Sequence, residues 1–147
     1  MKIVIQRVNR AHAHRPEETE VLAAIGEGLV LYVGIGRDDT AATVDKAATK
    51  VAHLRIFEEG ESLFGRSLVD VGGEALVLFQ MPMVADLSRG RRPNFSRAAS
   101  PDLARELFDR FVSQLAEHGV RTTAGPFREH LLLHAENRGP FTVPLEV

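Results

Sequence analysis

The segment "LVLYVGI", Leu29–Ile35, follows Gly26 and Gly28 and is apolar along its whole length. A continuous apolar run of this length is typical of a strand that is buried on both faces of a sheet. The segment "GGEALVLFQM" contains a second run of the same kind, Ala75–Phe79. The sequence therefore predicts two buried strands.

Weaker strand signals lie on either side of these two runs. Lys2–Val8 alternates in the manner of a strand, with Ile3 and Ile5 on one face. Ala11–His14 and Glu20–Ile25 flank a polar turn that contains a proline, which predicts a hairpin. Further strands are expected at Val120–Thr123, Leu131–Ala135 and Phe141–Val147, and an irregular stretch is expected between Gly60 and Gly65.

Apolar residues at helical spacing predict a first helix after Asp38 or Asp39, either of which is expected to cap it. Its buried face comprises Val44, Ala47, Ala48 and Val51, and the helix is expected to continue toward Phe57.

A second helix begins at Ser100, which is expected to be its N-cap, with Pro101 at the first helical position and Asp102 in the first turn. Gly119 stands where a C′ glycine is expected. The apolar face comprises Leu103, Leu107, Phe111 and Leu115. Strands mixed with two helices, without a linker or repeat, indicate one α+β domain that spans residues 1–147.

Composition excludes several classes of function. The chain has 147 residues, of which 44% are hydrophobic and 26% charged, as in an ordinary globular domain. Its net charge of −2 argues against binding nucleic acid by bulk electrostatics, so no DNA partner is expected and any RNA contact must be local. The absence of cysteine excludes disulfides and thiolate nucleophiles. No signal peptide and no run of membrane-spanning length is recognisable, so a cytoplasmic protein without a membrane partner is expected.

Common catalytic motifs are absent, and the histidines give only weak signals. His130 and His134 share a face of a helix or a strand, but their segment resembles a strand and no third ligand stands nearby, so neither a metal nor a cofactor is expected. His12 and His14 alternate along the predicted hairpin and are expected to be half-exposed cross-strand residues.

Four arginines, Arg89, Arg91, Arg92 and Arg97, fall within one polar loop, Leu87–Ser100. Arginine forks suit phosphate groups, and the neighbouring Phe95 has the flat ring that stacks on a nucleobase. A solvated loop accounts for the same composition, so both interpretations stay open.

The segment "ENRGPFTV", Glu136–Val143, places a Gly-Pro pair between two predicted strands. The simplest interpretation is a turn, because glycine supplies φ freedom and proline fixes φ near −65°. The alternative is that Gly139 and Pro140 present backbone atoms to a ligand, through a cis bond.

Several segments together resemble the D-aminoacyl-tRNA deacylases, in the order found in that family and over essentially the whole chain. They are "KIVIQRV", "EGLVLYVGIGRDD", "LRIFEEG", "RGRRPNFSRAASPDLARELFDRFV", "AGPF" and "ENRGPFTVPLEV". The resemblance implies a barrel-like sheet of antiparallel and mixed strands with two helices, a homodimer, and hydrolysis of the ester that joins a D-amino acid or glycine to the tRNA 3′ end. It also implies chiral proofreading in trans, as part of translation quality control.

The resemblance assigns a role to the Gly-Pro pair. In the family this bond is cis, and the pair from one subunit enters the active site of the other, where it rejects L-amino acids. Gly139 and Pro140 match the motif, with Phe141 and Thr142 following, and Gly125 and Phe127 match a Gly-x-Phe near the pocket. The substrate-binding residues are therefore expected to be Phe79, Phe127, Gly139, Pro140 and Thr142, and the four loop arginines are expected to contact tRNA.

A second family motif, Ser-Gln-x-Thr, departs from the pattern in this chain, which reads Phe79, Gln80, Met81, Pro82. A threonine nucleophile is thereby excluded. One interpretation is that the RNA 2′-hydroxyl assists hydrolysis while Gln80, the Met81 backbone and Pro82 form the catalytic site, with backbone N–H groups near Gln80 as oxyanion donors. The alternative is an idle or re-specified relative, which binds an aminoacyl-RNA end or acts on a different acyl ester.

Overall fold

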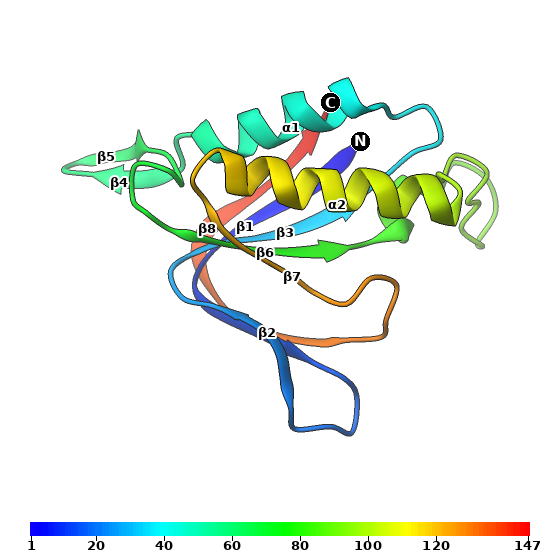
Figure 1. Cartoon of the computed structure of the whole chain (residues 1–147), viewed down its shortest axis with the longest axis horizontal. Helices are drawn as coiled ribbons and strands as arrows, with labels where there is room; N and C mark the ends of the chain where they lie inside the picture. The colour runs from blue at the N-terminus through cyan, green and yellow to red at the C-terminus, as the bar shows by residue number, and fades with distance from the viewer.

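A computed structural model describes residues 1–147 as one curved sheet with two helices and a separate hairpin (Figure 1). The main sheet has the order β2-β1-β3-β6-β7, and a sixth strand, β8, also pairs with β1. The elements in chain order are β1 Lys2–His14, β2 Val21–Ile25, β3 Gly28–Gly34, α1 Ala41–His53, β4 Phe57–Glu59, β5 Ser62–Arg66, β6 Glu74–Phe79, the 3₁₀ turn η1 Met81–Val84, α2 Pro101–Glu117, β7 Arg121–Ala124 and β8 Leu132–Glu146.

The two apolar runs are confirmed as β3 and β6, which pair in parallel from Gly28↔Glu74 to Val33↔Phe79. β6 pairs in parallel with β7 as well, whereas β1 is antiparallel to β2, β3 and β8. The carboxyl ends of β3, β6 and β7 therefore open toward the same edge of the sheet.

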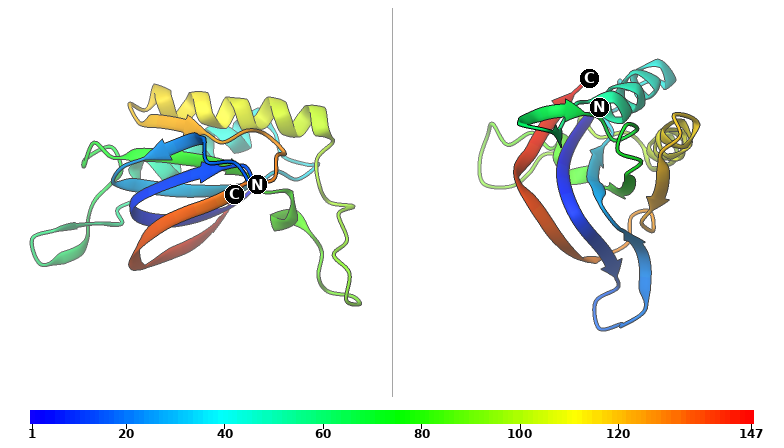
Figure 2. Two further views of the ribbon diagram at one scale, coloured as in Figure 1. Left: turned by 90° about the horizontal axis from the view of Figure 1, so that it is seen from below. Right: turned by 90° about the vertical axis from the view of Figure 1, so that its left-hand side faces the viewer.

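Both helices cover one face of the sheet, and β1 and β8 curve away from them (Figure 2). The larger core cluster lies between the helices and the sheet, and includes Val51 of α1 and Phe111 of α2, both fully buried. A smaller cluster fills the hollow of the sheet, where β2 folds across, and includes Val8, Ala23 and Leu76. Two cores on opposite faces of one curled sheet give the barrel-like α+β fold that the resemblance implies.

The start of α1 differs from the sequence-based expectation. The N-cap is Thr40, whose side chain accepts a hydrogen bond from the Thr43 N–H, rather than Asp38 or Asp39. Asp39 instead accepts from the Gly36 N–H at 2.7 Å and pairs with the amino-terminal ammonium group. The carboxylate that was expected to cap the helix is thus engaged before the helix begins.

The end of α1 and the segment after it also correct the expectation. α1 ends at His53, where the chain turns extended at Leu54. Phe57 is therefore not part of the helix and is buried in β4 instead. The stretch between Gly60 and Gly65 is not irregular but forms the hairpin β4–β5, in which Gly60 takes the positive φ of 58°. An isolated two-stranded hairpin carries little apolar pattern, so its signal in the sequence is weak.

The expectation of two strands joined by a turn at Gly139–Pro140 is wrong. The segment is one strand, β8, which stays paired with β1 from Glu146 back to Leu132. Register shifts on either side of Val8 accommodate the Gly-Pro pair within the ladder, and the Gly139–Pro140 bond is cis. The hairpin β1–β2 and the start of α2 at Ser100 are as expected. No helix of the structure is long and apolar enough to cross a membrane.

Candidate functional site

A pocket of about 300 Å³ opens at the carboxyl end of β6, where the chain leaves the parallel part of the sheet. Ligands commonly bind at this end of parallel strands. The pocket is lined by Phe79, Gln80, Met81, Pro82, Arg128, Glu129 and His130. The expected segment Phe79–Pro82 therefore lies in one pocket, together with three residues of the β7–β8 loop. Of these three, the sequence singled out only His130, and as a weak candidate for a metal ligand rather than as part of this pocket.

Phe79 forms the apolar floor of this pocket. The centroid of its ring lies 4.4 Å from that of Phe127 and 6.0 Å from that of Phe108. The Arg105 guanidinium lies over the Phe127 ring, 5.2 Å from its centroid. These contacts turn Phe79 toward the helix side of the sheet, where it packs on the larger core. Phe127 packs against Phe79 and does not itself line the pocket.

The backbone around Gln80 is largely committed to structure. The Gln80 N–H donates to the Val33 carbonyl at 2.8 Å, and the Gln80 carbonyl accepts from the Met83 N–H at 3.2 Å. The Gln80 N–H is therefore engaged in the sheet. The side-chain amide of Gln80 has no hydrogen-bond partner within the chain. Pro82 lies in the first turn of η1 and contributes neither a hydroxyl nor an N–H. No hydroxyl side chain lines the pocket.

Gly139 and Pro140 lie far from this pocket within one chain. Thr142 pairs with Gln6 on β1, whereas Phe79 pairs with Val33, which in turn pairs with Ile3. The Gly-Pro pair is thus displaced by roughly 10–13 Å along the strands and by three strand spacings of about 4.8 Å across them. A Cβ built on Gly139 meets no atom within 4 Å, so the pair faces open space.

Both the sequence and the fold of this chain are similar to those of known proteins. A family model described as D-Tyr-tRNA(Tyr) deacylase matches residues 4–146. The D-aminoacyl-tRNA deacylase of Thermotoga petrophila is 41% identical over 99% of this chain and 97% of its own length. The chain belongs to the D-Tyr-tRNA(Tyr) deacylase family.

One more relative and two solved structures are similar to this chain over nearly its whole length. The D-aminoacyl-tRNA deacylase of Roseiflexus sp. is 44% identical over 99% of this chain and 93% of its own length. A solved structure titled c-Myc DNA unwinding element binding protein superposes with a TM-score of 0.92 at 30% identity, covering 100% of this chain and 99% of the other. A structure of a probable eukaryotic D-amino acid tRNA deacylase has the same fold, with a TM-score of 0.84 at 19% identity over 99% and 98% of the two chains.

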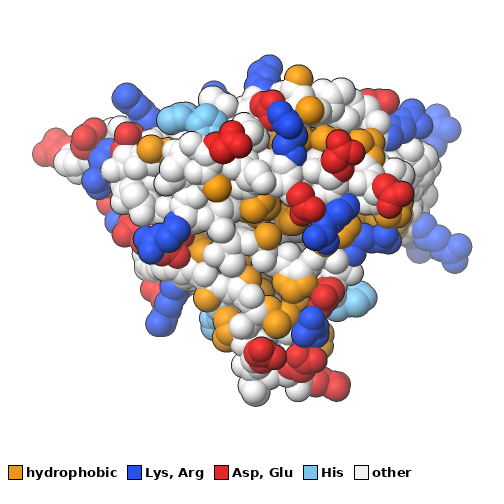
Figure 3. Space-filling model, in the orientation of Figure 1, with side chains coloured by type: hydrophobic (Ala, Val, Ile, Leu, Met, Phe, Trp, Pro, Cys, Tyr) orange, Lys and Arg blue, Asp and Glu red, His pale blue; other side chains and the backbone are white.

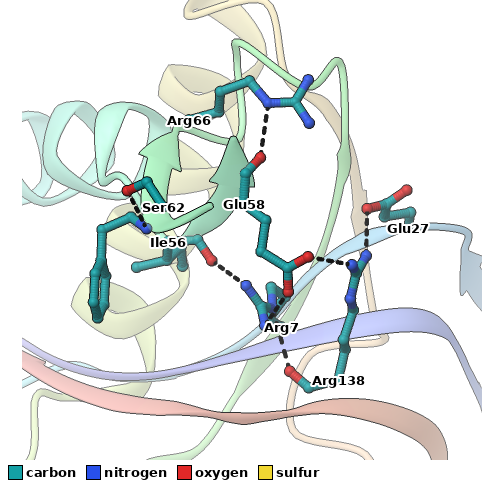
Figure 4. A network of polar contacts seen from close by, with 8 residues as sticks. Arg7, Glu27, Ile56, Glu58, Ser62, Arg66 and Arg138 are labelled. Carbon is teal, nitrogen blue, oxygen red and sulfur yellow. Dashed lines mark hydrogen bonds and ion pairs between the residues drawn. The ribbon is translucent and has the colours of Figure 1, made fainter. Parts of the chain in front are cut away.

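Arg7, which is only 2% exposed, binds the peptide group that precedes the Gly-Pro pair. Figure 4 shows Arg7 between Ile56, Glu58 and Arg138. Arg7 donates from Nε to the Arg138 carbonyl at 3.2 Å and from Nη1 to the Ile56 carbonyl at 2.7 Å. Its guanidinium also lies 3.5 Å from the Glu58 carboxylate and 4.4 Å from the centroid of the Phe141 ring. The peptide just before Gly139 is thereby tied to the β4–β5 hairpin.

The charges around Arg7 are balanced by two carboxylates. Arg138 pairs with Glu58 at 3.0 Å and with Glu27 at 3.2 Å, so Glu58 bridges two arginines (Figure 4). Burial lowers the pKa of Arg7, and the nearby Glu58 carboxylate opposes that shift. Sequence reasoning missed this network, although one signal was present: Arg7 continues the row of Ile3 and Ile5, on the strand face where alternation predicts apolar residues.

The arginine loop projects from the end of the molecule beside α2, and blue side chains gather over that edge (Figures 1 and 3). The Asp86 and Asn94 backbones bond to each other at 2.8 and 3.1 Å and close the loop at its base. Phe95 is 38% exposed. The arginines of the loop, Arg89, Arg91, Arg92 and Arg97, are exposed and form no ion pair in the chain.

The histidines separate into different places. His134 pairs with His12 across the strands, and its Nε2 lies 3.0 Å from the Nε2 of His14, whereas His130 lines the pocket. His12 and His14 are half-buried cross-strand residues, as expected. No group of three or more histidine or acidic side chains is arranged to hold a metal ion.

Proposed function

We propose that this chain hydrolyses D-aminoacyl-tRNA, and glycyl-tRNA in addition, in the pocket at the carboxyl end of β6. The reaction is hydrolysis of the ester that links the aminoacyl group to the tRNA 3′ end, and the chain is an aminoacyl-tRNA hydrolase. The observation that carries this proposal is the match to D-aminoacyl-tRNA deacylases at about 40% identity over 99% of the chain. We further infer that it works in the cytoplasm, where charged tRNA is used in translation.

We refer to Gly139 and Pro140 as the chiral gauge, and in this proposal the gauge of one subunit acts in the site of the other. The proposal is supported by two observations: Gly139 and Pro140 are exposed, and they lie several strands away from Phe79–Pro82 in the same chain. The outer edge of β8 has no partner strand, which leaves this part of the surface free for a second copy. A homodimer with two-fold symmetry then builds two identical sites, each from both chains.

Selection in such a site is steric. Backbone atoms held in place do not change rotamer, so they discriminate between the two positions that a side chain on the α-carbon can take. A D-amino acid directs its side chain away from Gly139 and Pro140, and glycine has none, whereas an L side chain collides. Thr142 and Phe79 complete the surface that surrounds the amino acid. Arg7 holds the gauge in place through its hydrogen bond to the Arg138 carbonyl.

Hydrolysis in this pocket proceeds without a protein nucleophile. The ester is an activated acyl group, and the neighbouring 2′-hydroxyl of the terminal adenosine can assist attack by water. Because the Gln80 N–H is engaged by Val33, the Met81 N–H is the oxyanion donor that remains. The free amide of Gln80 orients the acyl group, and Pro82 bounds the pocket.

The arginines of the loop, Arg89, Arg91, Arg92 and Arg97, supply contacts to the phosphates of the acceptor end. Such contacts position an RNA without reading its sequence. They are local, which agrees with a net charge of −2 and with rapid release of the product.

The decisive test is single-turnover hydrolysis of D-tyrosyl-, L-tyrosyl- and glycyl-tRNA by the purified protein. We expect the D-tyrosyl and glycyl esters to be cleaved and the L-tyrosyl ester to be spared. Cleavage of D and L esters at equal rates would remove the steric gauge from the proposal.

The structure also favours a second candidate, a relative that binds an aminoacyl-RNA end without cleaving it or that acts on another acyl ester. The observation behind it is that Phe79 fills the pocket floor and that no hydroxyl side chain lines the pocket. Tight binding of all three charged tRNAs without turnover, by a folded dimer, would make this the better assignment.

A further inference from the structure

Arg128 stands at the rim of the pocket, in the loop that joins β7 to β8. Its backbone has a φ of 62°, in the left-handed region that residues other than glycine rarely adopt. The loop is anchored on both sides of it: the Gly125 N–H donates to the Val77 carbonyl at 2.9 Å, and Glu129 bonds to Arg15 at 2.7 Å. A non-glycine residue in this conformation persists only where its surroundings fix it, and such residues cluster at ligand sites.

Arg128 has no ionic partner. The adjacent carboxylate, Glu129, is engaged by Arg15, which also reaches Glu18 at 3.5 Å. Of the other residues that line the pocket, none carries a carboxylate. A guanidinium is therefore held beside the pocket with its five N–H donors free, in the fork geometry that suits phosphate.

Further unpaired cations follow the pocket segment in the chain. Pro82 lies in η1, and the chain continues from η1 directly into the arginine loop, whose cations are also unpaired. The pocket lining at Pro82 is thus followed along the chain by a second group of unpaired cations. The terminal nucleotide of a tRNA carries a phosphodiester one sugar away from the ester, so an RNA end whose ester enters the pocket brings a phosphate close to Arg128.

We propose that Arg128 forms an anion subsite at the rim of the pocket and binds a phosphodiester of the tRNA 3′ end. The subsite rests on the proposed function for the identity of its ligand. It places Arg128 as a substrate-binding residue that fixes how deeply the ester enters, separate from the loop arginines that hold the RNA farther from the reaction.

The experiment measures binding of an uncharged RNA microhelix, ending in the tRNA 3′ sequence, by fluorescence anisotropy at several salt concentrations. We expect Arg128→Gln to weaken binding, and to reduce the slope of log affinity against log salt by about 0.7, the contribution of one phosphate in a single strand. Arg128→Gly is the second variant, because glycine takes a φ of 62° freely and so protects the fold. Arg121→Gln is the matched control, since that arginine is 77% exposed and pairs with Glu74 at the other end of β7.

Unchanged affinity and slope in both Arg128 variants would overturn the subsite. A side-chain carboxylate of the substrate offers the same chemistry as a phosphate, and hydrolysis of D-aspartyl- and D-asparaginyl-tRNA separates the two. A loss confined to the D-aspartyl ester, with RNA affinity intact, would overturn the phosphate assignment. Weaker RNA binding by Arg128→Gln in a protein that cleaves no ester would uphold the subsite and reject the proposed hydrolysis instead.

Discussion

At the scale of single residues, Arg7 shows how a buried charge is kept. A guanidinium this deeply buried needs acceptors, and it finds the carbonyls of Ile56 and Arg138 and the carboxylate of Glu58. The Phe141 ring covers the remaining face. Every one of these contacts lies on a different part of the chain from β1, so removing the side chain disturbs several elements at once.

We expect Arg7→Met to lower the free energy of unfolding by about 2–3 kcal/mol, because two carbonyls lose a donor in a buried setting. Urea denaturation measures the change. Arg121→Met, which removes an exposed arginine paired only with Glu74, is the control and should stay within about 0.5 kcal/mol of the wild type. Equal effects of the two substitutions would mean that the carbonyl contacts of Arg7 contribute nothing.

At the scale of elements, the parallel pairing of β3 with β6 depends on Gly28. A Cβ at this position would lie 1.9 Å from the Glu74 carbonyl oxygen, which is backbone and cannot move aside. Gly26, two residues earlier, is exposed and a Cβ there would meet nothing within 4 Å. The two glycines before the buried run therefore serve different purposes, although the sequence presents them alike.

Gly28→Ala should lower the free energy of unfolding by about 3 kcal/mol, since the strands must separate to admit the methyl group. Gly26→Ala should change it by less than about 1 kcal/mol, in either direction. Chemical denaturation of the two variants beside the wild type gives both values. If the two substitutions cost the same, close approach of the strands is not what Gly28 provides.

At the scale of the whole molecule, the proposed homodimer combines the pocket of one subunit with Gly139 and Pro140 of the other in each site. A variant with a blocked pocket, Gln80→Trp, and one with a blocked gauge, Gly139→Leu, should each be inactive as a pure dimer. Gly139 faces open space, so its substitution should leave the fold intact.

Mixed after partial unfolding and reassembly, the two variants should recover about a quarter of the wild-type single-turnover activity, because half the dimers are mixed and one of their two sites is intact. Unfolding and refolding each variant alone is the control. Absence of recovery, in mixtures that contain mixed dimers by native mass spectrometry, would place pocket and gauge in the same subunit.

Local pattern predicted much of this fold because it records burial. The apolar runs of β3 and β6 show that both faces of these strands are buried. The spacing of apolar residues along α2 shows which face of the helix is buried, and periodicity reports this directly. The continuity of β8 could not be predicted, because Asn137–Pro140 carries no strand pattern and is kept in the sheet by its pairing with β1. Phe79–Pro82 could be located from the resemblance, but Arg128–His130 join them only through the return of the chain beside β6.

In the proposed site, the hydrogen bond from Arg7 to the Arg138 carbonyl lets the β4–β5 hairpin act indirectly on the choice between D- and L-aminoacyl esters. Ile56 and Glu58 hold Arg7, and Phe64 at 58% exposed reaches the Phe141 ring at 5.4 Å. In the proposed site, a substitution in this hairpin touches no substrate, yet it shifts the backbone atoms that separate D- from L-amino acids. Damage to the hairpin would therefore surface as mistaken removal of correctly charged tRNA, an error of fidelity, before it surfaces as slower catalysis.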